Sequence, residues 1–496
     1  MKQQNVSRKI GKKPISHEKV YQLFGPQASF EEIRQAAARI CRDYLNGRWK
    51  EVPTEQLIVK RISGGLSNFL YYVSLPQECN STTTTNEVND SVASTSSSSA
   101  LAHSDNDENR NEQDFNDLLS AGDCNGNKRK RYDSSSSTLA SYRQKEPKEV
   151  LLRIYGQSHG EDALEQMITE SVVFALLSER HFGPRLYGIF PGGRLEQYIP
   201  ARALLTSELA IPEISMKIAE KMAEIHTLNI PMSKEPDWLW NCMERWQRYL
   251  PDILKPNSKW SDQDIVNFMR GVDYDAEVLW LRGVINQHNY PVLFCHNDMQ
   301  EGNILMKTTT NDEAEATEDV ALENISMSSE DATTVIGQKK PDLDSSGDSA
   351  IENANGCTVP DLKIIDFEYC AYNYRGFDLA NHFLEWTFNY NRSDAPFYYF
   401  LKENYPTTEQ RHQFIRTYLK KFNDKEDDWE PSQKEIDDVD EEVTVFTMMS
   451  HLFWSLWSLM NVTSNIEFGY WDYAICRAKE YLNLKQAYIN EHMMTV

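Results

Sequence analysis

Residues 295–303 read CHNDMQEGN, and residues 362–368 read LKIIDFE. The first stretch places Asp298 directly after a His-Asn pair, with Asn303 five positions later. The second places Asp366 at the end of a hydrophobic run typical of a strand. One carboxylate for an acceptor hydroxyl, with an amide and a second carboxylate for magnesium, is the set of groups that phosphotransferases use. The two stretches therefore predict a phosphoryl-transfer site.

The predicted roles divide among five side chains. Asp298 is the candidate base, because its carboxylate could orient or accept the proton of a substrate hydroxyl. Asn303 and Asp366 offer hard oxygen atoms, which suit magnesium held with ATP phosphates. Gln300 and Glu368 each closely follow an aspartate and are candidates to support metal or substrate. The alternative is that Asp298 and Asn303 only cap a loop. The preceding histidine and the hydrophobic run before Asp366 favour catalysis.

Composition limits the partners of this chain. Its 496 residues carry 51 Lys and Arg against 75 Asp and Glu, for a formal net charge of −24. A field this acidic argues against nucleic acid and against anionic membranes as partners. Hydrophobic residues make up 40% and aromatic residues 11%, which is enough for a sizeable core.

Cysteine spacing and hydropathy predict a cytoplasmic protein without a transmembrane segment. The 8 cysteines are scattered and form no Cys-x-x-Cys pair, which argues against a zinc site and fits reduced thiols. The N-terminal residues contain no apolar run typical of a signal peptide. Residues 443–462 lack Asp, Glu, Lys and Arg, but their many polar side chains favour a buried core helix over a membrane span.

Changes in composition divide the chain. Residues 1–20 read as a basic flexible tail, and residues 76–149 and 308–360 read as disordered insertions rich in serine and charged residues. Short strands and a helix fill the rest of residues 21–199, whereas residues 200–496 are mostly helical. Ser29 and Glu32 predict a capping box at the start of a helix. We therefore expect an α+β fold with a small sheet-rich lobe, a larger helical lobe and a cleft between them.

Two features of the N-terminal lobe are candidates for binding the phosphates of a nucleotide. A turn at Gly64 and Gly65 would let the backbone approach phosphates closely, with Ser67 and Asn68 as donors, although an ordinary hairpin turn is the alternative. Arg153 lies mid-strand among apolar residues and fits a cation that holds ATP phosphates.

Two further expectations follow from the same lobe. Glu170, on the next predicted helix, is a candidate ion-pair partner for Arg153, and a surface pair is the alternative. Residues 197–199 would join the two lobes and could offer backbone hydrogen bonds to adenine, although a plain linking strand fits the sequence as well.

Aromatic residues near the metal segment and in the C-terminal region predict a cation pocket. Trp454 and Trp457 share a helix face, and Tyr473 follows them. Tyr369 and Tyr390 lie near the metal segment, with the carboxylate Glu385 between them in sequence. Aromatic faces with a carboxylate suit a quaternary ammonium ion. The alternative is that this aromatic stripe belongs to the core.

Several short stretches together resemble the choline/ethanolamine kinase family. They are residues 63–68 (SGGLSN), 150–156 (VLLRIYG), 183–188 (GPRLYG), 294–305 (FCHNDMQEGNIL), 364–368 (IIDFE), 375–378 (RGFD), 381–383 (NHF) and 466–470 (IEFGY). They span nearly the whole chain outside the tail and the insertions. The Gln-Glu-Gly that follows Asp298 and Met299 looks more like the choline-kinase branch than the ethanolamine-kinase branch.

The resemblance implies a protein-kinase-like fold, also similar to that of aminoglycoside phosphotransferases, and phosphorylation of choline or ethanolamine by ATP with Mg²⁺. It assigns the base to Asp298 and the metal to Asn303 and Asp366. Nucleotide contacts are implied for Gly64, Gly65, Leu66, Ser67, Asn68, Phe69, Leu70, Arg153, Gln197, Tyr198, Ile199, Pro200, Ala201, Arg202 and Gln300. An amine pocket is implied at Tyr369, Glu385, Tyr390, Trp454, Trp457 and Tyr473. The resemblance also implies a homodimer.

The expected function is a choline kinase that makes phosphocholine, the first step of the phosphatidylcholine branch of phospholipid synthesis. The nearest alternative is an ethanolamine kinase with weak choline activity. A non-catalytic scaffold with the same fold is a third reading, against which the intact Asp298, Asn303 and Asp366 argue. The two insertions depart from the family pattern, but both could loop out from hairpin ends without moving the site, because the entropic cost of closing a loop grows slowly with its length.

Overall fold

The structure is a computed structural model that describes most of the chain. The described ranges are residues 17–25, 28–62, 68–76, 146–155, 163–255, 263–307, 361–423, 429–464 and 466–493. The predicted tail up to residue 16, nearly all of the 76–149 insertion, the whole 308–360 insertion and the turn at residues 63–67 lie outside the described residues. The elements below belong to one folded unit, formed from residues before 76 and after 146.

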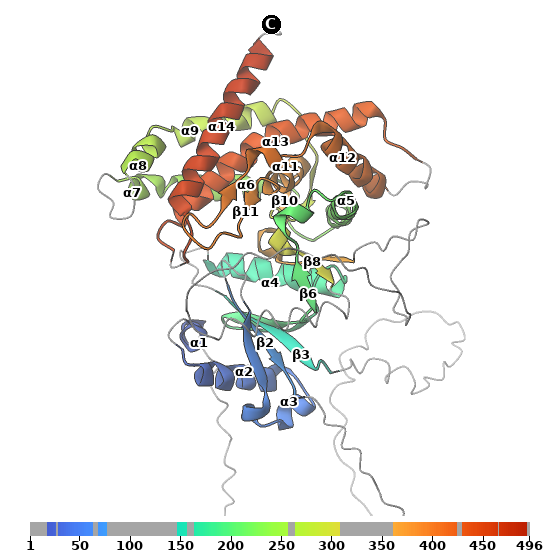
Figure 1. Cartoon of the computed structure of the whole chain (residues 1–496), viewed down its shortest axis with the longest axis vertical. Coiled ribbons are helices and arrows are strands. Elements are labelled where there is room, and N and C mark those ends of the chain that lie inside the picture. The colour runs from blue at the N-terminus through green and yellow to red at the C-terminus, as the bar shows by residue number, and fades with distance from the viewer. Residues whose placement is uncertain are drawn as a thin grey trace, which may run out of the picture. The chain divides into compact units, whose positions relative to one another are not determined.

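The N-terminal part of this unit is an antiparallel five-stranded sheet with the order β1-β2-β3-β5-β4 (Figure 1). The strands are β1 (Ile58–Ile62), β2 (Asn68–Ser74), β3 (Glu149–Tyr155), β4 (Leu186–Phe190) and β5 (Gly193–Glu196). Three helices precede or flank it, namely α1 (His17–Phe24), α2 (Phe30–Tyr44) and α3 (Arg48–Glu51). The predicted capping box at the start of α2 is confirmed, because the Glu32 N–H donates to Ser29 Oγ and the Ser29 N–H donates to the Glu32 carboxylate.

The alternation of side chains along β3 places Arg153 on the functional side of the sheet. Val150, Leu152 and Ile154 are fully buried in the core formed with α1 and α2. Successive side chains of a strand point to opposite faces, so Arg153 lies on the other face. Helix α4 (Ala163–Glu179) covers that face. The ring centroid of Phe174 in α4 lies 4.0 Å from the guanidinium carbon of Arg194, and Arg194 is opposite Arg153 in the β3–β5 ladder.

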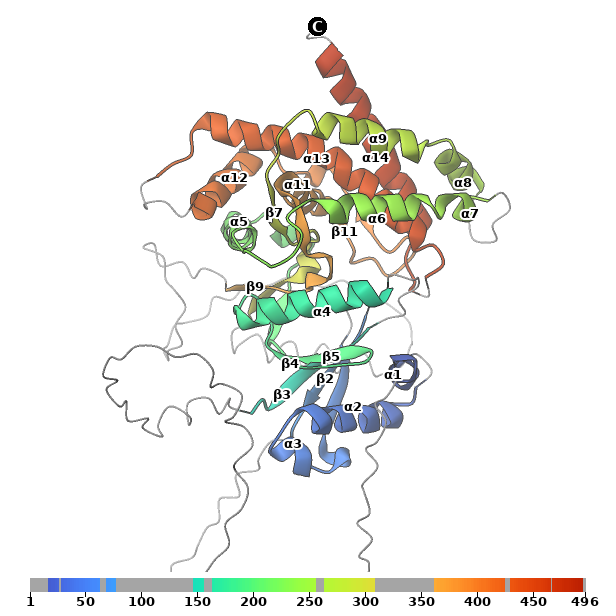
Figure 2. The same ribbon diagram turned by 180° about the vertical axis from the view of Figure 1, so that it is seen from behind.

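The C-terminal part is mainly helical, and both ribbon views show α4 lying between it and the sheet (Figures 1 and 2). Its helices are α5 (Pro212–His226), α6 (Asp237–Gln247), α7 (Leu250–Ile253), α8 (Gln263–Arg270), α9 (Tyr274–Ile285), α11 (Arg375–Glu385), α12 (Thr408–Asn423), α13 (Gln433–Met460) and α14 (Tyr470–Met493). A sheet-rich N-terminal lobe followed by a larger helical lobe confirms the predicted α+β class. We retain the proposed lobe boundary at 199/200, which falls between β5 and the next strand.

Three small sheets position the functional loops within the helical lobe. Strands β6 (Ala201–Ala203), β8 (Ile304–Lys307) and β9 (Leu362–Ile364) form a sheet in the order β6-β8-β9. Strand β7 (Val292–Cys295) pairs with β10 (Ala371–Tyr374), and β11 (Phe388–Asn389) pairs with β12 (Tyr399–Phe400). Short 3₁₀ turns at Glu301–Asn303 and Phe367–Tyr369 connect these strands to the predicted site.

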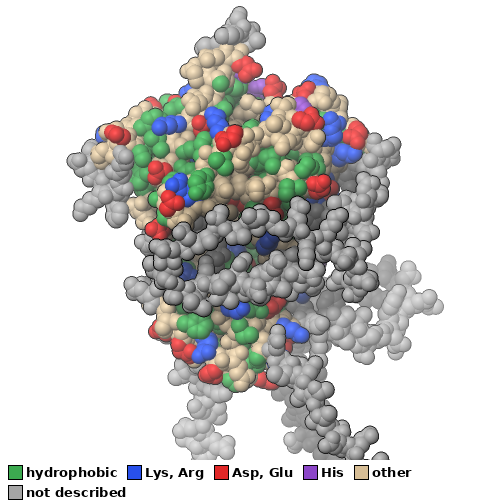
Figure 3. All heavy atoms as spheres, viewed as in Figure 1, with side chains coloured by type: hydrophobic (Ala, Val, Ile, Leu, Met, Phe, Trp, Pro, Cys, Tyr) green, Lys and Arg blue, Asp and Glu red, His purple; other side chains and the backbone are tan. Residues whose placement is uncertain are grey.

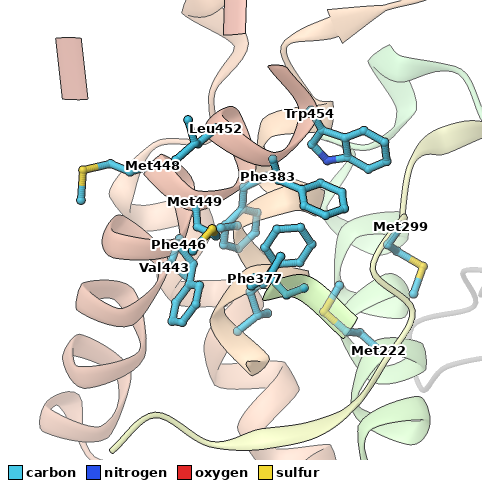
Figure 4. Close-up of a cluster of buried hydrophobic side chains, with 14 of the residues drawn as sticks. Met222, Met299, Phe377, Phe383, Val443, Phe446, Met448, Met449, Leu452 and Trp454 are labelled. Atoms are coloured by element: carbon cyan, nitrogen blue, oxygen red, sulfur yellow. The ribbon is translucent and has the colours of Figure 1, made fainter. Parts of the chain in front are cut away.

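The core of the helical lobe reaches directly beneath the predicted catalytic loop. Met299, which follows Asp298, is fully buried in the same cluster as Phe377, Phe383 and Trp454 (Figure 4). Helix α13 crosses this core. Its 28 residues are long and apolar enough to cross a membrane, but 83% of its apolar window is buried within the fold. This burial favours the predicted core helix over a span.

The described surface of the helical lobe carries both signs of charge. On the face shown in Figure 3, acidic and basic side chains alternate with apolar ones over α9, α12, α13 and α14. The described residues on that face therefore present a mixed surface of both charges.

Candidate active site

A strand pair brings Asn303 and Asp366 together. Strand β8 pairs antiparallel with β9, with Ile304 opposite Ile364, and the Ile365 N–H donates to the Asn303 carbonyl at 3.0 Å. Asn303 immediately precedes β8 and Asp366 closely follows β9, so both residues lie at the same end of this hairpin. The 308–360 segment joins the strands at their opposite ends. The length of that insertion therefore does not separate the two predicted metal ligands.

Asp298 lies between β7 and β8 and is half-buried. The Asn303 side-chain amide donates to its Oδ2 at 2.8 Å and to its backbone carbonyl at 2.9 Å. Burial raises the pKa of Asp298 to about 7, and the negative charges of Glu385 and Asp366 add to that rise. Hydrogen bonds from Asn303 and Gln300 lower the pKa of Asp298, but by less than burial and the two charges raise it. A carboxyl group that titrates near neutral pH suits a base that takes a substrate proton.

The loop carrying Asp298 is tied to helix α11 by a carboxylate for which the sequence had suggested no role. Asp378 is fully buried, and its two oxygens accept the backbone N–H groups of His296 (2.9 Å) and Asn297 (2.8 Å). His226 Nε2 lies 3.0 Å from the same carboxylate. Burial would raise the pKa of Asp378, but its hydrogen bond with His226 and the nearby histidines lower it below its usual value. Asp378 is therefore a buried anion that fixes the shape of the loop.

The adjoining residues tie the Asp298 loop to the Asp366 loop. His296 Nε2 lies 3.0 Å from the Ile365 carbonyl, and the Asn297 side chain donates to the Tyr369 carbonyl at 2.9 Å. Asn297 and Asp366 both have positive φ, at 66° and 65°, a conformation that is uncommon for non-glycine residues and that Asn and Asp adopt more readily than most. The two segments that the sequence predicted to act together are thus held together by direct hydrogen bonds.

Replacing Asp378 by Asn should destabilise the protein by about 1–3 kcal/mol, because an amide has one acceptor oxygen and leaves a buried N–H of the loop unpaired. Thermal unfolding of the purified variant measures this. Asp275→Asn is the control, since Asp275 is an exposed acceptor for Gln247 and its loss should change stability by less than about 0.5 kcal/mol. Equal melting temperatures for the two variants would contradict the anchoring role.

Arg153 forms ion pairs that differ from the predicted one. Its Nε lies 3.2 Å from Glu196 Oε1, and its Nη1 lies 3.0 Å from Asp366 Oδ1. Glu170 pairs instead with Arg194, at 2.6 Å, so the predicted Arg153–Glu170 pair was wrong. The reason is the strand register. Arg194 is the β5 residue opposite Arg153, and it forms the ion pair with Glu170 of α4. Arg153 nevertheless lies where the two lobes meet, in contact with a predicted metal ligand.

Three further predicted nucleotide residues lie on the strand next to that of Arg153. Asn68, Phe69 and Leu70 begin β2, and Leu70 is opposite Arg153 in the β2–β3 ladder. The other four residues of that predicted group, Gly64, Gly65, Leu66 and Ser67, lie outside the described residues.

The segment between the lobes has some of its hydrogen-bonding groups already engaged. The Gln197 N–H donates to the Arg185 carbonyl at 2.7 Å, so adenine would have to use other backbone groups of 197–199. The Tyr198 ring lies 4.6 Å from that of Tyr72 in an edge-on contact. Pro200 leads into β6, where Ala201 and Arg202 pair with β8, and the Arg202 guanidinium binds Glu208 at 2.7 Å. The predicted adenine-binding residues therefore adjoin the hairpin that carries Asn303.

The donor atoms at the end of this hairpin fit a magnesium ion. The Asn303 amide nitrogen is committed to Asp298, which leaves its amide oxygen for a cation. Asp366 Oδ1 faces Arg153, and within the described ranges its Oδ2 has no protein partner. A carboxylate and an amide oxygen are donors that Mg²⁺ prefers, and the Arg153 guanidinium lies beside them.

Two supporting residues proposed from the sequence lie next to these groups. Gln300 hydrogen-bonds with the Asp298 carboxylate and thereby lowers its pKa. Burial, followed by the charges of Asp366 and Glu170, raises the pKa of Glu368 well above its usual value. A bound divalent cation would oppose that rise by favouring the ionised form. Glu368 is therefore within electrostatic reach of Asp366, and Gln300 contacts the Asp298 carboxylate.

The first group of predicted pocket aromatics is assembled as one cluster. Tyr369 and Trp454 meet edge-on with ring centroids 5.8 Å apart, and Trp454 meets Trp457 at 5.3 Å. The Trp457 indole N–H donates to the Tyr369 hydroxyl at 3.1 Å. Tyr369 lies three residues after Asp366, so this cluster is attached to the predicted metal site by the 3₁₀ turn between them.

The second group surrounds a carboxylate. The Tyr390 hydroxyl donates to Glu385 Oε2 at 2.9 Å and lies 3.2 Å from the Tyr473 hydroxyl. Burial, together with the charge of Glu385, holds the pKa of Tyr390 well above its usual value, so the phenol stays neutral. Glu385 in turn raises the pKa of Asp298, which means that the two carboxylates lie within electrostatic reach of each other.

Several residues outside the predicted pocket set complete this arrangement. Phe468 contacts both Tyr390 (6.3 Å) and Tyr473 (5.6 Å), and Tyr470 links Phe468 to Trp457. Both residues lie in the 466–470 stretch that carried the family resemblance, so a signal existed. Buried Glu301 accepts from Thr206 at 2.8 Å, and Arg477 pairs with Glu385 at 2.8 Å. A charged residue in an apolar helical pattern was the available signal for Arg477.

Comparison with known proteins gives consistent matches. The family model described as choline/ethanolamine kinase matches residues 131–482. Choline kinase A2 of Caenorhabditis elegans is 34% identical over 460 residues, covering 92% of this chain and 86% of that protein. A human protein named choline/ethanolamine kinase is 34% identical over 463 residues, covering 93% of this chain and 88% of that protein.

Solved structures share the fold. A choline kinase from Cryptosporidium parvum covers 92% of this chain and 97% of its own, with a TM-score of 0.58 and 22% identity. A Plasmodium vivax ethanolamine kinase covers 94% of this chain and 92% of its own, with a TM-score of 0.56 and 16% identity. These likenesses support the predicted two-lobed architecture and, at this level of identity, speak to the fold alone.

Proposed function

The chain belongs to the choline/ethanolamine kinase family, and we propose that it transfers the γ-phosphoryl group of ATP to the hydroxyl of choline. The products are phosphocholine and ADP, and the reaction is the first step of the phosphatidylcholine branch of phospholipid synthesis. The observation that carries this proposal is the meeting of Asp298, Asn303 and Asp366 at one hairpin end, with an aromatic cluster beginning at Tyr369.

The proposed mechanism assigns one task to each group. Asp298 orients the choline hydroxyl and takes its proton as the oxygen attacks the γ-phosphorus, which its pKa of about 7 allows at neutral pH. Arg153, held by Glu196 at 3.2 Å, places a fixed positive charge near the phosphates. Asn303 and Asp366 would hold Mg²⁺, which when bound neutralises charge on the phosphate oxygens.

The proposed amine pocket would bind the other end of the substrate. Tyr369, Trp454 and Trp457 offer ring faces, and Glu385 offers a carboxylate. A desolvated cation–π contact contributes about 2 kcal/mol, so a few such faces provide much of the binding energy for a small cation.

The direct test is to incubate the purified full-length chain with ATP, Mg²⁺ and choline and to follow phosphocholine by ³¹P NMR. We expect turnover that disappears when EDTA removes the metal. A parallel reaction with ethanolamine tests the alternative activity, which the family name and the aromatic pocket leave open. Absence of product from either amine would reject the proposal in favour of a non-catalytic scaffold, and failure to bind Mg-ATP would support that scaffold.

Replacing Trp454 by Ala should lower kcat/KM for choline about 10–30-fold more than for ethanolamine, because the methylated cation depends more on ring faces. The ratio of the two specificity constants is measured on one preparation, so any unfolded fraction cancels. Trp280→Ala on α9, outside the pocket, is the control and should leave the ratio unchanged. A ratio that does not move in Trp454→Ala would remove Trp454 from the pocket.

We also propose a magnesium requirement, a homodimer and a cytoplasmic location. Magnesium is supported by the oxygen donors of Asn303 and Asp366. The homodimer rests on the family resemblance. The location is supported by the cysteines within the described ranges, which are all free thiols and fit a reducing compartment.

A further inference from the structure

Arg477 lies beneath the proposed amine pocket. It comes from α14, its side chain is 0% exposed, and it is among the largest fully buried side chains of the described residues. Its guanidinium lies 3.9 Å from the Phe388 ring centroid and 4.9 Å from that of Tyr473. Burial would lower the pKa of Arg477, but Tyr473 and Glu385 raise it above its usual value. A permanent cation of the protein is therefore present where a cationic substrate would bind.

This arginine closes a ring of hydrogen bonds among the pocket residues. Arg477 Nη2 donates to Glu385 Oε1 at 2.8 Å and also to the Tyr473 hydroxyl. The Tyr390 hydroxyl donates to the other Glu385 oxygen, Oε2, at 2.9 Å and lies 3.2 Å from the Tyr473 hydroxyl. Both oxygens of the carboxylate and both phenol groups are thus already engaged with one another.

The arrangement is not explained by the needs of Arg477 itself. Within the described residues its Nε and Nη1 are buried without a hydrogen-bond partner. A buried arginine placed only for stability would be expected to satisfy more of its five donors. Arg477 Nη2 donates to one oxygen of Glu385 and to the hydroxyl of Tyr473. Its hydrogen bonds are therefore made to polar atoms of the proposed pocket.

An engaged set of acceptors discriminates between amines. A primary ammonium has three N–H donors and loses strong hydration on entering a pocket, so it needs acceptors there. A trimethylammonium has no N–H donor and is attracted by aromatic faces and by diffuse negative charge. A pocket whose carboxylate and phenols are bonded to one another offers ring faces and few free acceptors. Such a pocket favours the methylated amine.

We propose that Arg477 is a positioning residue that makes this pocket select quaternary over primary ammonium substrates. It does so by occupying Glu385 Oε1 and the Tyr473 hydroxyl, and by balancing the charge of the Glu385 carboxylate. Without it, Glu385 and Tyr473 would be free to accept hydrogen bonds from a primary ammonium. This inference rests on the proposed function, because it concerns the choice between two amines at the same site.

The main test compares kcat/KM for choline, for its less methylated analogues and for ethanolamine in wild type, Arg477→Met and Arg477→Lys. We expect the choline-to-ethanolamine ratio to fall about 10-fold in Arg477→Met, with a graded change along the methylated series. Arg477→Lys retains the charge but not the planar guanidinium, so its ratio should fall between those of wild type and Arg477→Met. An unchanged ratio in Arg477→Met overturns the inference. A purely structural role would lower both efficiencies together and leave the ratio unaltered.

A second comparison decides the question if Arg477→Met does not fold. Glu385→Gln leaves the Arg477 charge uncompensated beside the substrate cation and should lower choline efficiency about 100-fold. The double variant, Glu385→Gln with Arg477→Met, removes both charges and should recover at least 10-fold of that loss. A double variant that is unfolded, or no more active than Glu385→Gln, overturns the inference because the pair would then only support the fold.

Arg375→Met provides the matched control. Arg375 forms an ion pair with buried Glu442 in the same lobe, outside the pocket. Its loss should lower the melting temperature and leave the amine ratio unchanged. Wild-type activity separates the two levels of failure. If the wild type phosphorylates neither amine, the proposed function fails. If the wild type is active and the choline-to-ethanolamine ratio is the same in Arg477→Met, only this inference fails.

Discussion

Asp298→Asn should lower kcat by about 10²–10⁴-fold while leaving ATP affinity nearly unchanged. The substitution keeps the size of the side chain and an oxygen that can accept from Asn303, but it removes the group that takes the substrate proton. Single-turnover kinetics with Mg-ATP and choline measure the chemical step, and equilibrium titration measures nucleotide binding. An equal loss of turnover and of ATP binding would remove Asp298 from the role of base.

The same substitution should stabilise the substrate-free protein at alkaline pH. The pKa of Asp298 is about 7 in the fold, above the value of about 3.9 for an unfolded aspartate. The unfolded chain thus releases this proton more readily, so stability falls as pH rises from about 4 through about 7. Asn carries no such cost. Allowing for the partial exposure of the site, we expect a gain of about 1–2 kcal/mol at pH 8 that vanishes near pH 4.

Thermal unfolding in magnesium-free buffer at the two pH values measures this difference. Asp252→Asn is the control, because Asp252 is 73% exposed beside Lys255 and should change neither stability nor turnover appreciably. If Asp298→Asn were less stable than wild type at pH 8, the ionised Asp298 carboxylate would have to stabilise the fold in the absence of metal and substrate. The combination of lost turnover and gained stability is what a strained catalytic group produces.

Asp366→Asn should lower kcat/KM by about 10³-fold, because it removes the only formal negative charge proposed for the magnesium ion. It also weakens the ion pair between Asp366 and Arg153. The apparent magnesium requirement should rise in parallel, since an amide oxygen binds the ion more weakly than a carboxylate. A magnesium titration of initial rates, at fixed ATP and choline, reports both effects.

The matched control lies on the same hairpin. Asp361 is 47% exposed and pairs with Lys307 at its other end, so Asp361→Asn should keep wild-type turnover and magnesium dependence. If Asp366→Asn retained activity within about 10-fold of wild type at saturating magnesium, the metal would have to be held elsewhere. A loss shared equally by the two variants would point to damage to the hairpin and not to the metal site.

Much of the fold could be predicted because local signals and tertiary packing agree. The Ser29–Glu32 capping box and the buried helix within residues 443–462 follow directly from turn chemistry and hydropathy. The short strands β6, β11 and β12 could not be predicted in this way. Each has two or three residues, too few for a period, and each exists because a partner strand is adjacent.

The site was predictable in its chemical groups and less so in their partners. Residue type and spacing indicated Asp298, Asn303 and Asp366, since few side chains suit those tasks. The partner of Arg153 depended on which strand pairs with β3, and nothing local to the sequence encodes that register. Asp378 and Arg477 were missed for the same reason, because their roles arise from contacts across the fold, to His296 and to Glu385.

The β8–β9 hairpin has a consequence for how this protein can diverge. Asn303 and Asp366 are aligned by the ladder itself, through the bond from the Ile365 N–H to the Asn303 carbonyl and the pairing of Ile304 with Ile364. The chain that connects the two strands, residues 308–360, joins them at the end of the hairpin opposite to Asn303 and Asp366. Evolution is thus free to lengthen, shorten or rewrite that path, and an engineer is free to graft a sensor or a tag there, while the spacing of the two ligands stays under the control of four residues.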